Sequence, residues 1–397
     1  MKNKKSKRRV YADAAAATPL SNAAKAELVR LLDVYGNAGG LHAEAVKAKD
    51  VLESSRKTVA ETIGAHNDEI FFTASGTEAN NLALAGVLRP LLHQGSAGQA
   101  PHVITSAIEH SSILQVLFAL EKDGLEITIL PVDSEGLVNP KDVAAAIKEN
   151  TALVSIQLVN SEIGTILPIQ EIAKHLRKNS KKIYLHTDAS QAPLWLQLKV
   201  EKLGVDLLTL DAQKVLGPKG VGALFIKRGT TVEPQMLGGG QEAGLRSGTP
   251  NTPLVGAFAV AIKEAAKNAE ESAKNITEVR DYCFVEIKKL LPDAILNGPE
   301  VENRVANNLN ISIPGLDAQM AVIALNVAGV AASTRSACDV GDDEPSHVIQ
   351  ALGIPKNLAG TAIRFTFLPT ATQADATFIA QALATVALLY KDDYRES

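Results

Sequence analysis

The segment VDLLTLDAQKVLGPKGVGALFIKR (residues 205–228) decides the fold, because it places two β-rich runs on either side of a turn rich in glycine and proline. Five more runs of this kind precede it: EIFFTAS (69–75), HVITSA (102–107), LEITILPV (125–132), TALVSIQLV (151–159) and KIYLHTD (182–188). Amphipathic patterns such as PIQEIAKHLRKNSKK (168–182) separate several of them. Apolar strands that alternate with helices are typical of a largely parallel sheet buried on both faces. The sequence therefore predicts an α/β fold with a mostly parallel, seven-stranded sheet.

The chain changes character after about residue 255, where a long charged helical stretch begins. A smaller set of elements follows it, including the strand candidates NNLNISIP (307–314) and AIRFTFLP (362–369). We predict a basic disordered tail at 1–9 and a large domain at 19–265. A smaller α+β domain is predicted from 10–18 together with 266–397. At the start of the large domain, SNAAKAELVRLLDVYG (21–36) predicts a helix that buries Leu28, Leu31, Leu32 and Tyr35 on one face.

Composition is ordinary for a globular enzyme, with 46% hydrophobic and 21% charged residues in 397. We expect no membrane contact, because no apolar run approaches the roughly 18 residues of a membrane span. The net charge of -4 hides six positive charges in KNKKSKRR (2–9). A nucleic-acid contact or a localisation signal is the alternative to a solvated tail. We predict no direct nucleic-acid binding and a cytoplasmic protein.

One of the two cysteines, Cys338, lies in STRSACDVGDDEPSH (333–347), among small, acidic and turn-forming residues. This composition predicts an exposed, mobile loop. The other, Cys283, falls inside the long helical stretch and is predicted to be packed in the core. We predict no metal site, because DVGDDE lacks the aspartate spacing and final glutamate of a calcium loop. Two cysteines in so long a chain indicate a reducing compartment without disulfides.

Reactive side chains follow several strand candidates of the large domain. Lys214 lies in the turn before the last strand, and Asp188 and Gln191 come just after KIYLHTD. In TASGTEANN, Gly76 and Thr77 begin a helix, where free N–H groups and the helix dipole favour a phosphate. His110 follows another strand in AIEHSS. An amine, a carboxylate, an imidazole and an anion site at one sheet edge are what pyridoxal 5'-phosphate requires.

With these motifs the sequence resembles the cysteine desulfurases of the NifS/IscS type, within the class V aminotransferases. The resemblance runs from about Tyr11 to the last helix, through these segments: GNAGGLHAEA, FFTASGTEANN, AIEHSS, VNSEIG, HTDASQ, QKVLGPKGVGAL, GGGQEAGLRSGTPN, STRSACDVGDDEPSHV and AIRF. It implies the fold type I of pyridoxal-phosphate-dependent transferases and a sulfurtransferase activity that converts L-cysteine to L-alanine.

The resemblance also implies a role for each matching residue. Lys214 is the Schiff-base lysine, His110 the acid/base residue that stacks on the ring, Asp188 the partner of the pyridine nitrogen and Gln191 that of the phenolic oxygen. The phosphate is held by Gly76, Thr77, Gln213 and, from a second subunit of a homodimer, Thr249. The substrate carboxylate is bound by Arg364, Asn160 and Asn37.

In this family the mobile thiol takes sulfur from the substrate, so the resemblance implies a persulfide on Cys338. An acceptor protein, such as an iron–sulfur scaffold or a tRNA-thiolation relay, then receives the sulfur. Two alternatives stay open: a related lyase or aminotransferase, such as a selenocysteine lyase, and a catalytically degenerate subunit that binds a partner. The second is motivated by Asp211 and Gln213, which stand where the family commonly has Ser and His. Asp211 places a negative charge beside the phosphate unless it points away or meets a cation.

Overall fold

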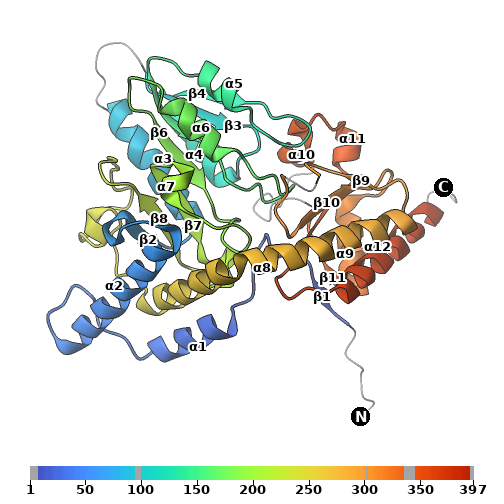
Figure 1. The fold of residues 1–397 in the computed structure, drawn as a ribbon, viewed down its shortest axis with the longest axis horizontal. Helices are drawn as coiled ribbons and strands as arrows, with labels where there is room; N and C mark the ends of the chain where they lie inside the picture. Colours follow the sequence, from blue (N-terminus) through green and yellow to red (C-terminus); the bar gives the residue numbers. More distant parts are fainter. Residues whose placement is uncertain (1–7, 94–99, 301–302, 335–344, 394–397) are drawn as a thin grey trace.

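The computed structural model describes residues 8–93, 100–300, 303–334 and 345–393 (Figure 1). Most of the basic tail and Cys338 with most of its loop lie outside the described residues. No helix in the described ranges has the length and apolar character needed to cross a bilayer.

The central sheet has seven strands: β2 (Ile70–Thr73), β3 (His102–Ser106), β4 (Glu126–Leu130), β5 (Thr151–Ser155), β6 (Tyr184–Asp188), β7 (Leu207–Asp211) and β8 (Gly222–Ile226). Their order is β2-β8-β7-β6-β5-β3-β4. Only β8 runs antiparallel to its neighbours, while the other pairs are parallel. The prediction of a mostly parallel seven-stranded sheet is confirmed, and each strand lies within a segment predicted from its apolar run.

Helices cover both faces of this sheet (Figure 1). They are α2 (Ala43–Ile63), α3 (Gly76–His93), α4 (Ser111–Glu121), α5 (Pro140–Ala145), α6 (Ile169–Leu176) and α7 (Val200–Leu203). Alternate strand residues feed two separate cores: Val103 and Leu207 pack with α3 and α4, whereas Ile104 and Leu208 pack with α6 and α7. Both faces are therefore apolar, which explains why the strands lack polar alternation.

A long helix, α8 (Thr252–Leu290), connects the two parts of the molecule (Figure 1). It packs against α1 (Asn22–Leu31) and α2 at one end and against α12 (Gln373–Asp393) at the other. Cys283 is fully buried in it, as predicted, with its sulfur 3.7 Å from the Ala376 carbonyl oxygen. The predicted domain boundary at 265/266 falls inside this unbroken helix, and the division into domains stays a prediction.

A second, antiparallel sheet has the order β12-β10-β9, with strands Ala362–Thr366, Asn308–Ser312 and Ile295–Leu296. The N-terminal strand β1 (Val10–Tyr11) pairs in parallel with β11 (Val330–Ala331). The helices of this part, besides α12, are α9 (Ala318–Ala328), α10 (His347–Ala351) and α11 (Lys356–Ala359). The N-terminal segment therefore lies beside the last third of the chain.

The prediction for the first helix is partly wrong. Ser21 caps α1 as expected, accepting a hydrogen bond from the Ala24 N–H, but the helix ends at Leu31. Leu31 is fully buried, whereas Leu32 and Tyr35 are 63% and 80% exposed. A side chain on Gly256 of α8 would lie 2.1 Å from Leu31, so the glycine permits the close approach of α1. The 3.6-residue pattern fails beyond Leu31 because the chain is no longer helical there.

Candidate active site

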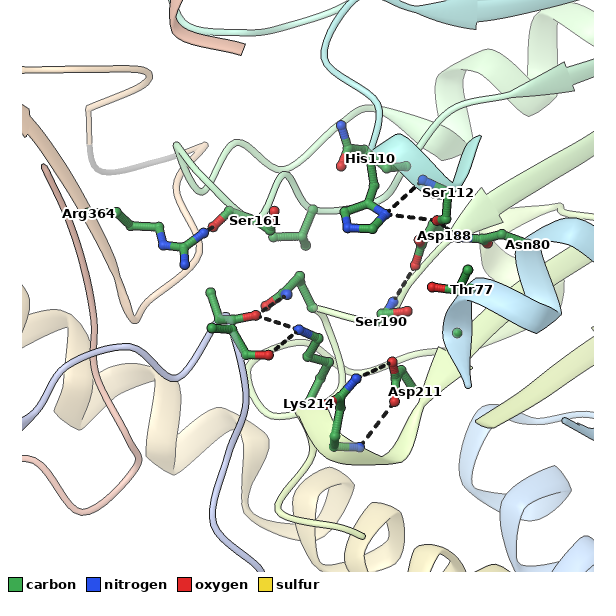
Figure 2. Close-up of a pocket in the computed structure, with 17 residues that line it drawn as sticks. Thr77, Asn80, His110, Ser112, Ser161, Asp188, Ser190, Asp211, Lys214 and Arg364 are labelled. Carbon is green, nitrogen blue, oxygen red and sulfur yellow. Dashed lines mark hydrogen bonds between the residues drawn. The ribbon is translucent and has the colours of Figure 1, made fainter. Parts of the chain in front are cut away.

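The carboxyl ends of the parallel strands bring the reactive side chains to one cavity of about 260 Å³ (Figure 2). Asp188 and Asp211 are the last residues of β6 and β7. Gly76 opens α3 after β2, and His110 caps α4 after β3. Lys214 follows β7 in a short 3-10 helix, η2 (Ala212–Lys214). This edge is where open α/β sheets bind ligands.

The Lys214 amine points into the cavity and is held by the N-terminal segment. Its Nζ donates hydrogen bonds of 2.7 Å to both the Ala15 and the Ala16 carbonyl oxygens. The side chain of Gln191 also donates to Ala15, over 2.9 Å. The segment before α1 therefore closes one side of the cavity and fixes the amine there.

The Asp188 carboxylate is held in one orientation. Asn80 Nδ2 donates to its Oδ2 over 2.8 Å, and the Ser190 N–H donates to its Oδ1 over 2.9 Å. Beneath it His186 is fully buried between Ser155 and Thr209, and burial lowers the pKa of this histidine to about 4. His186 is therefore neutral at pH 7 and forms no ion pair with the Asp188 carboxylate, which faces the cavity.

His110 is oriented by the helix that it caps. Its Nδ1 accepts a hydrogen bond of 3.1 Å from the Ser112 N–H and lies 2.8 Å from the Ser112 hydroxyl. An accepting Nδ1 places the proton of the neutral ring on Nε2. Behind it, Glu109 is buried with Ser106 and the Gln157 N–H, and burial raises the pKa of Glu109 to about 8. The imidazole is therefore available for proton transfer with no ionised glutamate directly behind it at neutral pH.

Arg364 lies on the opposite side of the cavity from Thr77 and Asp211 (Figure 2). It stands on β12, is 1% exposed and pairs with Asp13 over 2.8 Å. Its Nη1 donates to the Ser161 carbonyl oxygen over 3.2 Å, while its Nε has no partner among the described residues. A buried guanidinium with an unused donor is suited to a ligand carboxylate.

The start of α3 is the predicted anion site. First-turn N–H groups such as those of Gly76 and Thr77 have no acceptor within the helix itself. A Cβ on Gly76 would lie 3.1 Å from the Ser190 hydroxyl and 3.2 Å from Asp211 Oδ2, so glycine keeps this space open. The Asp211 carboxylate borders this space, in which the phosphate is predicted to bind.

Comparison with known proteins agrees with this geometry. The family model for aminotransferase class V matches residues 10–378. The chain belongs to the class V aminotransferase family. It is 41% identical to "Cysteine desulfurase IscS" of Dictyoglomus turgidum, over 96% of this chain and 95% of the relative.

Two solved structures are similar to this class V chain. A "NIFS-LIKE PROTEIN" has a TM-score of 0.89 and 30% identity, covering 96% of this chain and all of that one. "SspA in complex with cysteine" has a TM-score of 0.78 and 31% identity, covering 91% and 99%.

Most of the predicted class V residues line the cavity: Gly76, Thr77, His110, Asp188, Gln191, Gln213, Lys214 and Arg364. Three do not. Asn160 is buried beside it, donating to the Ile108 carbonyl oxygen and accepting from the Glu162 and Ile163 N–H groups. Asn37 and Thr249 are exposed in the single chain. Their roles in substrate and phosphate binding stay predictions.

Sequence reasoning missed three residues that orient the site. Asn80 and Ser190 fix the Asp188 carboxylate, and Asp13 balances Arg364. The first two stand inside the motifs TASGTEANN and HTDASQ, so the motif letters themselves are the available signal. The pairing of Asp13 with Arg364 spans 351 residues and leaves no local trace in the sequence.

Proposed function

We propose that the chain is a cysteine desulfurase that uses pyridoxal 5'-phosphate to convert L-cysteine to L-alanine, leaving the sulfur as a persulfide on Cys338. The supporting observation is that the Lys214 amine, the Asp188 carboxylate and the Arg364 guanidinium face one cavity. These groups suit, respectively, an aldehyde, a protonated ring nitrogen and an amino acid carboxylate. The names of the relatives point to the same activity.

The residues present fit this cofactor. Gly76 leaves the anion site open, and the Oδ1 of Asn80, which also lines the cavity, has no partner within the described residues. Lys214 would hold the cofactor covalently, Asp188 its ring nitrogen and Gln191 its phenolic oxygen. Gly76, Thr77 and Gln213 would hold its phosphate, and the ring would lie against His110.

The bound cofactor supplies an acceptor for the electrons released at the α-carbon of the substrate. Arg364 binds the substrate carboxylate, and Asp13 keeps the guanidinium oriented for it. Lys214 Nζ would take the α-proton, and His110 would exchange a proton through Nε2. The Ala15 and Ala16 carbonyls hold the Lys214 amine in the cavity.

Cys338 lies outside the described residues, but the chain is anchored on both sides of it. The Ser333 N–H and carbonyl pair with the Arg364 backbone over 3.1 and 2.7 Å. Ser346 is buried and donates to Glu162 over 2.5 Å. Thiolate attack on the substrate sulfur forms the S–S bond and breaks the Cβ–S bond. The Cβ gains a proton, giving alanine and a persulfide.

The test is to add L-cysteine to purified protein and measure alanine together with a mass gain of one sulfur on Cys338. Lys214→Ala abolishes alanine formation and the visible absorption of the bound cofactor. Cys338→Ala stops sulfur transfer. Equal turnover of free cysteine by Cys338→Ala and parent would favour a related lyase. A parent without the visible band would favour a degenerate subunit.

We also infer a homodimer in which Thr249 completes the phosphate site of the partner subunit. Thr249 is exposed in the single chain, and the apolar side chains of Leu32, Tyr35 and Leu237 are 63%, 80% and 83% exposed. Mixed dimers of Lys214→Ala and Thr249→Ala subunits contain one site with both native residues. Mixing the inactive Lys214→Ala variant with the weakly active Thr249→Ala variant therefore restores activity, whereas a site built within one subunit gives no recovery.

The sulfur acceptor is proposed to be a protein that builds iron–sulfur clusters or thiolated cofactors or tRNA, in the cytoplasm. A thiolate of the acceptor can take the outer sulfur of a persulfide by exchange, so the acceptor needs an accessible cysteine. Incubating the persulfide form with a candidate acceptor and measuring loss of sulfur from Cys338 tests each one.

A further inference from the structure

Asp211 projects into the cavity at the start of α3. It is 7% exposed, and its Oδ2 lies 3.2 Å from the position of a Cβ on Gly76. Gln213 holds it there, because the Gln213 N–H and Nε2 donate to its Oδ1 and Oδ2 over 3.2 and 3.1 Å (Figure 2). The carboxylate is therefore fixed beside the anion site.

No protein cation neutralises Asp211. Within the described ranges it forms no ion pair with a lysine, arginine or histidine. The other charged or titratable groups on the cavity are His110, Asp188, Lys214 and Arg364.

The Lys214 amine is directed to the Ala15 and Ala16 carbonyls and Arg364 to Asp13. On α3 itself, Glu78 pairs with Arg246 over 2.9 Å. Within the described residues Asp211 is thus compensated by the two Gln213 donors and by the dipole of α3, which the ligand phosphate also needs.

A phosphate monoester is mainly a dianion above its second pKa of about 6. Placing a dianion against a fixed, buried carboxylate that forms no ion pair within the described residues is strongly unfavourable. One proton between the two groups lowers their combined negative charge by one and replaces the closest repulsive contact with a short charge-assisted hydrogen bond.

We propose that Asp211 makes cofactor binding proton-coupled: the phosphate is bound as a monoanion that shares one proton with the Asp211 carboxylate. The inference rests on the proposed function, since it concerns the same cofactor. The proton comes from solvent, so binding takes up one proton at neutral pH. Cofactor affinity therefore falls as pH rises, about tenfold per pH unit for one proton.

The experiment measures the dissociation constant of pyridoxal 5'-phosphate from the apoprotein between pH 7 and 9, for the parent and Asp211→Asn. Asparagine keeps the size and an oxygen for the Gln213 N–H but removes the charge. We expect the ratio of the parent to the variant constant to grow about tenfold per pH unit. Asp211→Ser serves as a second variant, and thermal unfolding confirms that each is folded.

Two controls separate Asp211 from the other groups. Pyridoxal, which reacts with the same lysine amine but has no phosphate, measures any effect of the Asp211 variants on Lys214 ionisation. Pyridoxal without phosphate gives a ratio that does not change with pH. The phosphorus NMR resonance of the bound cofactor at pH 8 lies at the monoanion position in the parent and at the dianion position in Asp211→Asn.

A pH-independent ratio for the phosphate ester, or a dianion resonance in the parent, overturns the inference while leaving the proposed function intact. Absence of cofactor binding to parent and variants at every pH overturns the proposed function itself. The two failures are therefore distinguishable.

Discussion

The two ends of the cavity handle buried charge in opposite ways. At one end the Arg364 guanidinium is balanced by Asp13 and still has an unused Nε donor. At the other end the Asp211 carboxylate meets only the amide and N–H of Gln213. The Arg364 end is neutralised by the protein, whereas the Asp211 end, in our proposal, takes up a proton from solvent when its ligand binds.

The difference shows that charge alone does not identify what a pocket binds. A neutralised ion pair with a spare donor is a preorganised carboxylate site, because the desolvation of the arginine has already been offset. A carboxylate beside an anion site repels a dianion. The two ends of the cavity therefore differ in whether the protein itself balances the buried charge.

The largest effect is expected from Arg364→Lys, which breaks the Arg364 end. A lysine keeps the charge but loses the guanidinium fork, and each lost charge-assisted hydrogen bond costs about 1.5–3 kcal/mol. We expect kcat/KM for L-cysteine to fall about 100-fold or more, chiefly through KM. Steady-state kinetics measures this. Asp13→Asn is the matched control and should lose less, because the guanidinium remains; an unchanged KM in Arg364→Lys would contradict the role.

Gly76→Ala tests the Asp211 end by filling the anion site. The added methyl would lie 3.0 Å from Asp211 Cβ and 3.1 Å from the Ser190 hydroxyl. Overpacking of this kind costs about 1–3 kcal/mol, so cofactor affinity should fall roughly tenfold to 100-fold. Titration of the apoprotein measures it. Gly360→Ala, whose nearest neighbour is at 3.7 Å, is the control and should bind as the parent does.

A third carboxylate, Glu109, sharpens the comparison because it is buried but does not line the cavity. Burial raises its pKa from 4.5 to about 8, so the folded state binds its proton more tightly than the unfolded state. Its contribution to stability is complete below about pH 4.5 and is lost as pH rises to about 8. In our proposal Asp211 makes cofactor binding depend on pH, whereas Glu109 makes the stability of the folded protein depend on pH.

Glu109→Gln should therefore become more stable relative to the parent as pH rises through this window. The slope is at most about 1.4 kcal/mol per pH unit, the value for one proton. Urea unfolding of parent and variant at pH 5, 6, 7 and 8 provides the comparison. Parallel stability curves for the two proteins would show that Glu109 is ionised in the fold.

The sheet was predictable because its strands are buried on both faces. Runs such as TALVSIQLV are largely apolar at the positions that face both sides of the sheet, which distinguishes them from surface strands. The end of α1 was not predictable from Leu32 and Tyr35, since apolar residues continue the helical spacing after the helix has stopped. The local sequence pattern does not show that Leu32 and Tyr35 are exposed, because exposure depends on contacts with segments that are distant in the sequence.

The site was predictable where motif letters and strand ends coincide, as for Lys214 and Asp188. The direction of Asp211 was left open by the sequence, because it depends on how Gln213 folds back in η2. The Asn80 contact with Asp188 spans 108 residues. Such pairs are set by how strands and helices assemble, so spacing along the chain carries no record of them.

The smallest effect is expected from Cys283→Ala, which leaves Cys338 as the remaining thiol of the chain. Cys283 is fully buried, and burial raises the pKa of its thiol far above the ordinary value, so it stays protonated and unreactive. Removing its sulfur should lower the free energy of unfolding by about 1–2 kcal/mol. Turnover of L-cysteine and affinity for the cofactor should be unchanged.

Native alkylation followed by mass spectrometry measures this difference between the two thiols. Parent and Cys283→Ala should take up the same amount of label, all of it on Cys338. Label or persulfide sulfur on Cys283 in the folded parent would contradict its inertness. The amount of sulfur bound to the protein would then not measure the reaction at the cavity alone. Sulfur transfer by Arg364 and Asp211 variants would have to be compared in the Cys283→Ala background.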